Sequence, residues 1–538
     1  MKPQLLGLQR MTARLLADFE NISGLTRITL PLMALILGGA MIPTCAQQAR
    51  ETNGAGTLSA NTELVLVPVQ VEGPGGKPLR GLHQGDFVLR GDGKAQPIKI
   101  FEETGGPPAE STTATKAATP SATAAGEFSN VPDGGLPQHL LIIAIDRVNT
   151  PYGEQGWARQ ALLKFFSKGM PEQPFALVEI TEGGLMQLHS FSSDPKALLD
   201  AIGNDHGKMS KTEQKHEVKG ELPFPGSFAP ADAAAFKGTV EMKAISATVS
   251  NFMQLEQAYA GVPGRKSLIW LSADMPDVEE IAAILNRGNI ALYPVNLRGI
   301  QADTHLLGED DDTHTGSSEP PSGDNGMRDL ALRTGGRYCS AMTELKTCIG
   351  QAVADSTNYY LLGFYVTQQD RKPGWHKLEV KLTSGRGRIY SRSGYYLEPR
   401  TASTQDEILG DLIAAANAQI AYTGVAFSVE HLAESTGSTG GFRIRVPATS
   451  VLLQSGQRNL SYEIAMVVLS QNGEPTAEAH TIRLDLNAEQ TEHALTQGWR
   501  YDETLSKPAS AAVKFIVRDN GTGNIGSVVV PLTEGRKN

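Results

Sequence analysis

A series of unbroken apolar runs between residues 138 and 366 constrains the fold more than any other feature. Each run is apolar along nearly its whole length, and stretches with one apolar face at helical spacing lie between the runs. Strands that are apolar on both faces, in alternation with amphipathic helices, are typical of a parallel sheet covered on both sides. The sequence therefore predicts a doubly wound α/β domain over residues 138–366. Its expected strands are 139–145, 175–180, 267–271, 290–295 and 359–365.

Further modules are expected on both sides of this domain, because 538 residues exceed the usual size of about 100 to 200 residues for one domain. Alternating apolar residues and turn residues indicate additional β structure, and a stretch rich in Gly, Pro, Ser and Thr indicates a flexible linker. The predicted parts are a small β module at 62–103, the linker at 104–137, a β extension at 367–397 and a C-terminal β-sandwich at 405–535. Within the α/β domain, the polar stretches 204–236 and 301–325 are expected to be surface loops.

The first 46 residues have the pattern of a secretory signal peptide. Basic residues precede the apolar run 30–42, and Cys45 and Ala46 follow it. We expect cleavage after Ala46. A lipid anchor at Cys45 is the alternative, but Ile-Pro-Thr in front of that cysteine matches a lipobox poorly. The run is shorter than the roughly 20 apolar residues of a membrane span, so the chain is expected to be secreted or periplasmic, with no transmembrane span after signal removal.

Export would leave two cysteines, Cys339 and Cys348. In an oxidising compartment such an even pair is expected to form a disulfide. The alternative is that Cys348 is a buried free thiol, because it falls in the apolar pattern of an expected helix. No nearby motif would make either cysteine a nucleophile, so the pair is expected to be structural.

The charge balance excludes one class of partner. The chain has 48 Lys and Arg residues against 58 Asp and Glu residues, a formal net charge of −10, and no run rich in Lys or Arg. Nucleic acid binding depends on a basic surface. We therefore expect no nucleic acid partner.

The candidate site lies where the first apolar run ends. Ligands of open parallel sheets bind beyond the carboxyl ends of the strands, and Asp146 occupies this position, with Thr150 shortly after it. Asp274 follows a later strand in the same way. The alternative is that Asp146 caps the next helix or accepts hydrogen bonds from backbone amides. Arg147 could then pair with an acid and supply the positive charge of a cation.

The segment around Asp146 resembles a von Willebrand factor type A domain. Such domains hold a divalent cation with Asp-x-Ser-x-Ser at this place and with a Thr and an Asp from two further loops. By this resemblance the ligand positions are occupied by Asp146, Val148 in place of the first Ser, Thr150, either Thr248 or Thr239, and Asp274. Since valine offers no oxygen, the resemblance implies a degenerate site for Mg²⁺, or for Mn²⁺ or Ca²⁺.

A wider set of motifs resembles exported acidobacterial proteins with a VWFA-related domain. The resemblance covers residues 62–397 and includes Pro-Gly-Arg-Lys at 263–266, Thr-Gly-Gly-Arg at 334–337 and Arg-Ser-Gly-Tyr-Tyr at 392–396. That family has no common reaction, and its kinship with type A domains implies adhesion or protein binding. We therefore expect a non-enzymatic protein whose partner is another protein or a cell-surface component.

Enzyme motifs give little support for catalysis. Gly-x-Gly-x-x-Gly at 521–526 lies between two strand-like runs, where a glycine-rich hairpin is expected instead of a phosphate loop. The sequence has no Walker A, His-Glu-x-x-His, Gly-x-Ser-x-Gly or Cys-x-x-Cys motif. Two alternatives to a cation-dependent binding protein stay open: a metal-independent structural or assembly component of the cell envelope, and an extracytoplasmic hydrolase.

Overall fold

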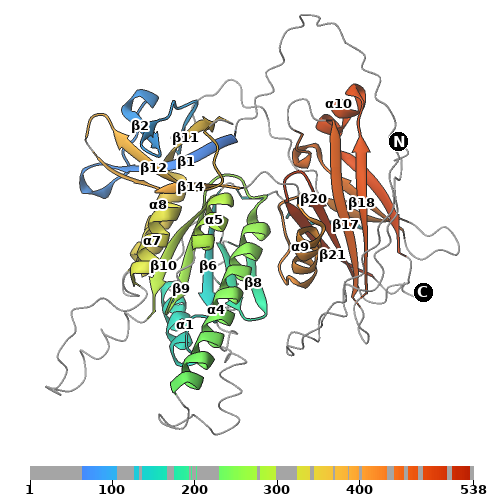
Figure 1. The fold of residues 1–538 in the computed structure, drawn as a ribbon, viewed down its shortest axis with the longest axis horizontal. Coiled ribbons are helices and arrows are strands. Elements are labelled where there is room, and N and C mark those ends of the chain that lie inside the picture. The colour runs from blue at the N-terminus through green and yellow to red at the C-terminus, as the bar shows by residue number, and fades with distance from the viewer. Residues whose placement is uncertain are drawn as a thin grey trace, which may run out of the picture.

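The structure is a computed structural model that describes three parts of the chain (Figure 1). The described residues are 63–105, 126–192, 230–297, 324–398 and 403–532, each with short gaps in places, together with 196 and 202. The predicted signal peptide 1–46 lies outside the described residues. So do 106–125 of the predicted linker, and nearly all of 204–229 and 301–323 in the two predicted loops.

A five-stranded mixed sheet forms the centre of the α/β part. Its strands, in spatial order, are β10 (Ile290–Asn296), β9 (Lys266–Ser272), β6 (Leu140–Asp146), β7 (Phe175–Thr181) and β8 (Gly184–Ser192). The first four are parallel, and β8 returns antiparallel beside β7. Along β6, Ile142 faces one apolar core and Ile143 faces another. Both faces of the sheet are therefore buried, which accounts for the unbroken apolar runs in the sequence.

Helices contribute to the apolar cores on both faces of this sheet. The helices are α1 (Tyr152–Phe166), α4 (Pro230–Tyr259), α5 (Glu279–Arg287), α7 (Asp324–Thr334) and α8 (Leu345–Thr357). Residues of α4, α5 and α7 join one core, and residues of α1 and α8 join the other. Residues 230–236, predicted as part of a loop, belong to α4, and 324–325 belong to α7. Among the described residues, no helix is long and apolar enough to cross a membrane.

The small β module is assembled from two separate stretches of the chain. One sheet contains, in order, β13 (Arg388–Ser391), β1 (Glu63–Glu72), β11 (Tyr359–Val366) and β4 (Ile100–Thr104). The other contains β14 (Gly394–Leu397), β12 (Gly374–Leu382), β2 (Phe87–Gly91) and β3 (Lys94–Ala95). Apolar residues of both sheets share one core. Two 3-10 turns, Pro74–Gly76 and Gln84–Asp86, lie in the same module.

The assignment of strand 359–365 to the α/β domain is therefore wrong. β11 pairs antiparallel with β1, where Leu362 lies opposite Val67, and with β4 on its other side. An apolar run does not reveal whether its partners are parallel or antiparallel, nor how far along the chain they lie. The predicted extension 367–397 belongs to the same module, because β12, β13 and β14 join its two sheets.

The C-terminal part consists of two four-stranded antiparallel sheets around one apolar core. One contains β19 (Trp499–Thr504), β16 (Gly441–Val446), β15 (Ser428–Leu432) and β5 (Glu127–Ser129). The other contains β18 (Thr476–Asp485), β17 (Asn459–Leu469), β20 (Ala512–Asp519) and β21 (Ile525–Pro531). The remaining elements are the helices α9 (Gln405–Asn417) and α10 (Ala488–Gln497) and the 3-10 turn Ala448–Ser450. The glycine-rich segment 521–526 spans the turn between the antiparallel strands β20 and β21.

One strand of this part comes from the predicted linker. β5 pairs with β15, and Phe128 lies opposite Val429. Just after β5, the side chain of Asn130 donates hydrogen bonds to the carbonyls of Tyr422 and Val425, at 2.8 Å each. The prediction of a linker at 104–137 is therefore wrong for these residues. A strand of three residues is too short to show a period in the sequence.

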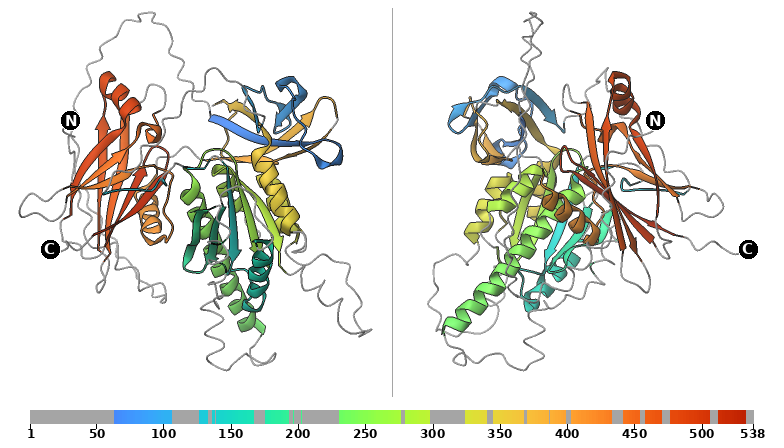
Figure 2. Two further views of the ribbon diagram at one scale, coloured as in Figure 1. Left: turned by 180° about the vertical axis from the view of Figure 1, so that it is seen from behind. Right: turned by 45° about the vertical axis from the view of Figure 1, so that its right-hand side comes forward.

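The two β parts contact different regions of the α/β part (Figure 2). The C-terminal part meets the end of α4, where Thr423 donates a hydrogen bond from Oγ1 to the carbonyl of Ala258 at 2.7 Å. The small β module lies at the amino ends of the strands, because Pro68 of β1 shares a pocket with Arg265 and Asn289, which directly precede β9 and β10. Asp146 is at the opposite end of the sheet.

Candidate functional site

Asp146, the last residue of β6, is fully buried and surrounded by hydrogen-bond donors. Its Oδ1 atom accepts from the backbone N–H of Val148 at 2.8 Å and of Asn149 at 3.0 Å. Its Oδ2 atom accepts from the side chains of Asn149, Ser272 and Trp270, at 2.8, 2.9 and 3.1 Å. The carboxylate thus fixes the turn after β6 and ties that turn to the neighbouring strand.

The parallel pairing of β6 and β9 explains why two of these donors reach Asp146. Ala144 lies opposite Trp270, and Ile145 lies opposite Leu271. Trp270 and Ser272 are two residues apart on β9, so their side chains point to the same face. Sequence analysis missed both donors. A signal was present, because a tryptophan inside an unbroken apolar strand needs a partner for its indole N–H.

The electrostatics of Asp146 follow from this enclosure. Burial raises the pKa of Asp146 above its ordinary value, and the hydrogen bonds to its carboxylate act in the opposite direction. Four of the five contacting groups are N–H donors, whereas the Ser272 hydroxyl lies 2.9 Å from Asp146 Oδ2 and 2.7 Å from the carbonyl of Asp274 and has a single hydrogen for the two.

The other predicted ligands lie nearby but have internal partners. Thr150 is buried and accepts a hydrogen bond at Oγ1 from the backbone N–H of Ala273 at 3.2 Å. Asp274 is partly exposed and accepts from the N–H of Met275 at 2.8 Å. Thr248, on α4, accepts from the Asn149 side chain at 2.9 Å and donates to the carbonyl of Ala244.

The remaining predicted positions contribute no ligand that the structure describes. The apolar side chain of Val148 is partly buried and packs against the core. Thr239 lies in α4, but its side chain is outside the described residues.

Arg147 faces away from this carboxylate and has its own acid. Its Nη2 and Nε atoms lie 2.5 and 2.9 Å from Glu179 Oε1, and its Nη1 atom donates to Gln155 at 2.9 Å. Arg147 and Glu179 are both buried. Arg147 therefore does pair with an acid, but that acid is Glu179 and not Asp146.

The donor set around Asp146 does not fit a divalent cation. Mg²⁺ and Ca²⁺ bind oxygen lone pairs, and two carboxylate oxygens offer about four of them. Here five donors already occupy those oxygens, and four of the five are N–H groups that would point at the ion. Within the described residues, no three His, Cys, Asp or Glu side chains gather in a way that could hold a metal. We therefore derive no chemistry through a metal here.

The two cysteines meet in the α/β part. Cys339 and Cys348 form a disulfide, with Cα atoms 6.1 Å apart. Cys348 lies on α8, and both residues are buried in the core that covers one face of the sheet. The predicted bridge therefore forms, and Cys348 is not the free thiol given as the alternative, although it does lie on a helix.

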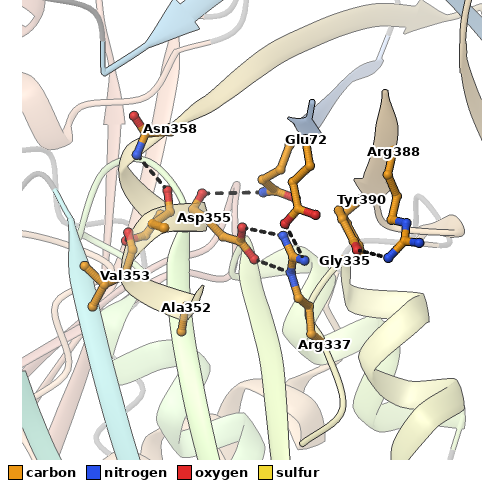
Figure 3. A network of polar contacts seen from close by, with 12 residues as sticks. Glu72, Gly335, Arg337, Ala352, Val353, Asp355, Asn358, Arg388 and Tyr390 are labelled. Atoms are coloured by element: carbon orange, nitrogen blue, oxygen red, sulfur yellow. Dashed lines mark hydrogen bonds and ion pairs between the residues drawn. The ribbon is translucent and has the colours of Figure 1, made fainter. Parts of the chain in front are cut away.

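A second polar cluster lies at the seam, by which we mean the contact between the β module and the amino edge of the α/β sheet. Figure 3 shows its centre, Arg337. Arg337 donates to both carboxylate oxygens of Asp355 at 2.8 and 2.9 Å and pairs with Glu72 at 2.7 Å. Its guanidinium lies 3.5 Å from the ring centre of Tyr390. Burial opposes the charge of Arg337, but the bonds to Asp355 and Glu72 outweigh it and raise its pKa.

The seam collects the arginines of all three quoted motifs. Arg265 donates to the hydroxyl of Tyr293 at 3.0 Å, and Tyr293 donates to Asp355 at 2.8 Å. Arg392 donates to Asn286 at 3.3 Å and to the carbonyl of Leu66. The motif spacing alone predicts no site for these arginines. The sequence feature that could have indicated this polar cluster is the arginine that each of the three motifs contains.

Comparisons with known proteins add little to this geometry. No family model matches the chain, and no curated protein sequence matches it. Among solved structures, the crystal structure of the SpRpn10 VWA domain is similar at 10% sequence identity and a TM-score of 0.16. That match covers 30% of this chain and 88% of the domain. We infer nothing about the site from a likeness at this level.

Proposed function

We propose that this protein is an exported, non-enzymatic binding or assembly protein whose doubly wound, type A-like domain recognises another protein or a cell-surface component without a metal ion. The observation that carries the proposal is the enclosure of Asp146. Its carboxylate accepts five hydrogen bonds and has no exposed surface. The position that would hold a cation serves instead to fix the carboxyl edge of the sheet.

The recognition surface in this proposal is the outside of the same edge. Tyr152, at the start of α1, is 46% exposed, and Asp274 is partly exposed at the end of β9. Exposed aromatic side chains such as that of Tyr152 are enriched at protein–protein interfaces. The disulfide between Cys339 and Cys348 is compatible with an extracellular location.

The hydrolase alternative receives no support from Asp146. A catalytic acid or nucleophile must come within about 3 Å of a substrate atom. The carboxylate of Asp146 is instead enclosed by the side chains of Trp270 and Ser272 and by the turn that follows β6.

Two measurements test the proposal. The first is calorimetric titration of the purified protein with Mg²⁺ and Mn²⁺, beside the Asp146→Ala variant. We expect no heat of binding from either protein. Saturable heat from the native chain that disappears in the variant would overturn metal independence.

The second measurement is chemical crosslinking to an envelope fraction, with and without EDTA. We expect the same crosslinked partner in both conditions, and its loss in Tyr152→Asp. Tyr365→Asp is the matched control, because Tyr365 is 43% exposed but lies on β11 in the small β module. Equal crosslinking by native chain and Tyr152→Asp would refute the assigned surface.

A further inference from the structure

A small pocket at the seam is lined by two arginines that bond no acid among the residues that the structure describes. Its walls include Arg265, Asn286, Thr334 and Gly335 of the α/β part, and Pro68 and Arg392 of the β module. Its volume is about 10 Å³, which is room for one water molecule or one small ion.

Each of these two arginines has one N–H group that makes no hydrogen bond to the described residues. Arg265 is 2% exposed, and its Nη2 atom donates to Tyr293 and to the carbonyl of Gly335, at 3.0 and 2.8 Å. Arg392 is partly exposed as a residue, but its Nε atom is buried. Among the residues that the structure describes, neither Nε–H has an acceptor. A buried donor without an acceptor costs about 1 to 3 kcal/mol, and more when the group is charged.

The acids of the seam bond a different arginine. Arg337 bonds both Asp355 and Glu72. The partners that the structure describes for Arg265 and Arg392 are neutral oxygens, from a phenol, an amide and two carbonyls. Burial lowers the pKa of Arg392 to about 10.

The backbone keeps this pocket narrow. Gly335 has a φ of 77°, and a Cβ atom there would lie 2.8 Å from the backbone nitrogen of Arg392. The backbone N–H of Ser393 also donates to the carbonyl of Leu332 at 3.0 Å. The two domains thus approach too closely at this point for a bulky ligand to enter between them.

We propose that the seam pocket binds one small inorganic anion of the size of chloride, shared by Arg265 and Arg392. The anion accepts from the two N–H groups that have no other acceptor among the described residues, and it offsets part of the positive charge of the two arginines. It thereby joins the β module to the α/β part. This site is independent of the carboxyl edge and of the function proposed for it.

The test compares thermal unfolding of the full chain in chloride and in gluconate at equal ionic strength. We expect the midpoint in chloride to be higher by about 2 to 4 °C and to saturate with concentration, since ligands that bind only the folded state stabilise it in this way. The Arg392→Gln variant is expected to lose this difference. Arg443→Gln, which removes a partly exposed arginine paired with Asp502 on the C-terminal sheets, is expected to keep it.

A second measurement on the native chain covers the case in which Arg392→Gln does not fold. Crystals grown in bromide should show one anomalous peak within hydrogen-bond distance of Arg265 and Arg392. Equal midpoints in chloride and gluconate, or the absence of anomalous signal at the seam, would overturn the proposal and leave the pocket to water.

Discussion

Trp270 donates its indole N–H to the Oδ2 atom of Asp146 at 3.1 Å, across two neighbouring parallel strands. The indole is fully buried and also packs edge-on against Phe252, with ring centres 5.5 Å apart. The single aromatic residue of β9 is therefore joined directly to the carboxylate at the end of β6. The interaction makes Asp146 part of the core.

The first prediction concerns the stability contributed by Asp146. We expect Asp146→Ala to lower the free energy of unfolding by about 3 kcal/mol or more, because five donors lose their acceptor inside the protein. Calorimetric unfolding at neutral pH measures the change. Asp274→Ala is the control, with an expected loss of about 1 kcal/mol or less, because Asp274 is partly exposed. Similar losses in both variants would contradict this account of Asp146.

The second prediction concerns the ion pairs of the seam. Arg337→Ala leaves the buried carboxylate of Asp355 without its cation, and we expect a loss of about 3 kcal/mol. Glu72→Gln removes a more exposed partner of the same arginine, and the expected loss is about 1 kcal/mol or less. Urea unfolding of both variants gives the comparison. A larger effect of Glu72→Gln than of Arg337→Ala would show that Asp355 is not the main partner.

The third prediction concerns the disulfide. Cys339 and Cys348 are separated by 9 positions, and a loop of that length stabilises a fold by about 2 to 3 kcal/mol through the unfolded state. We expect a reductant to lower the unfolding midpoint of the native chain. The double variant Cys339→Ala with Cys348→Ala should unfold at the reduced midpoint and show no response to reductant. A native midpoint that does not move on full reduction would contradict the prediction.

The fourth prediction concerns alkaline pH. Burial lowers the pKa values of Lys266 and Lys514 to about 8, against 10.5 for an ordinary lysine. Between these values the unfolded chain binds more protons than the folded one, so stability rises as pH increases from 8 towards 10. The free energy of unfolding decreases again as pH falls through 8, because both buried amines must then carry a charge.

Substitution of both lysines checks the pH prediction. We expect the native chain to gain about 1 to 3 kcal/mol between pH 8 and pH 10. Lys266→Met with Lys514→Met should show a flat profile over the same range. The range stops near pH 10 because burial raises the pKa of Tyr422, so that above this value the unfolded state loses tyrosine protons first. An identical rise in the double variant would assign the effect to other groups.

The sequence predicted the strands of the α/β part well where their burial shows directly in their own residues. The runs at β6, β7, β9 and β10 are unbroken because both faces of the sheet are covered, and periodicity reports this directly. β8 was missed, since it is an edge strand with Gln187 and His189 among its apolar residues. β11 was misplaced, because its partner β1 is about 300 residues earlier in the chain.

The sequence predicted that three polar residues lie near one another, but not which groups they contact. Asp146, Thr150 and Asp274 do lie together at the ends of β6 and β9. What the sequence could not reveal is the direction of two side chains on the neighbouring strand, because that depends on the register between β6 and β9. Trp270 and Ser272 become donors to Asp146 only in the observed register.

The short strand β5 has a consequence for how this protein can be divided. Glu127–Ser129 belongs to the C-terminal sheets, while β11 to β14 belong with the first strands of the chain. Each β unit is therefore built from two separate stretches of the chain. In the sequence, the α/β part lies between the two stretches of each unit. A fragment that begins at residue 403 would leave one edge of β15 bare, and a fragment that ends at 105 would lack half of its own sheets. Neither unit is encoded by a continuous piece of the gene, so loss or exchange of one unit by a single recombination event would also break another.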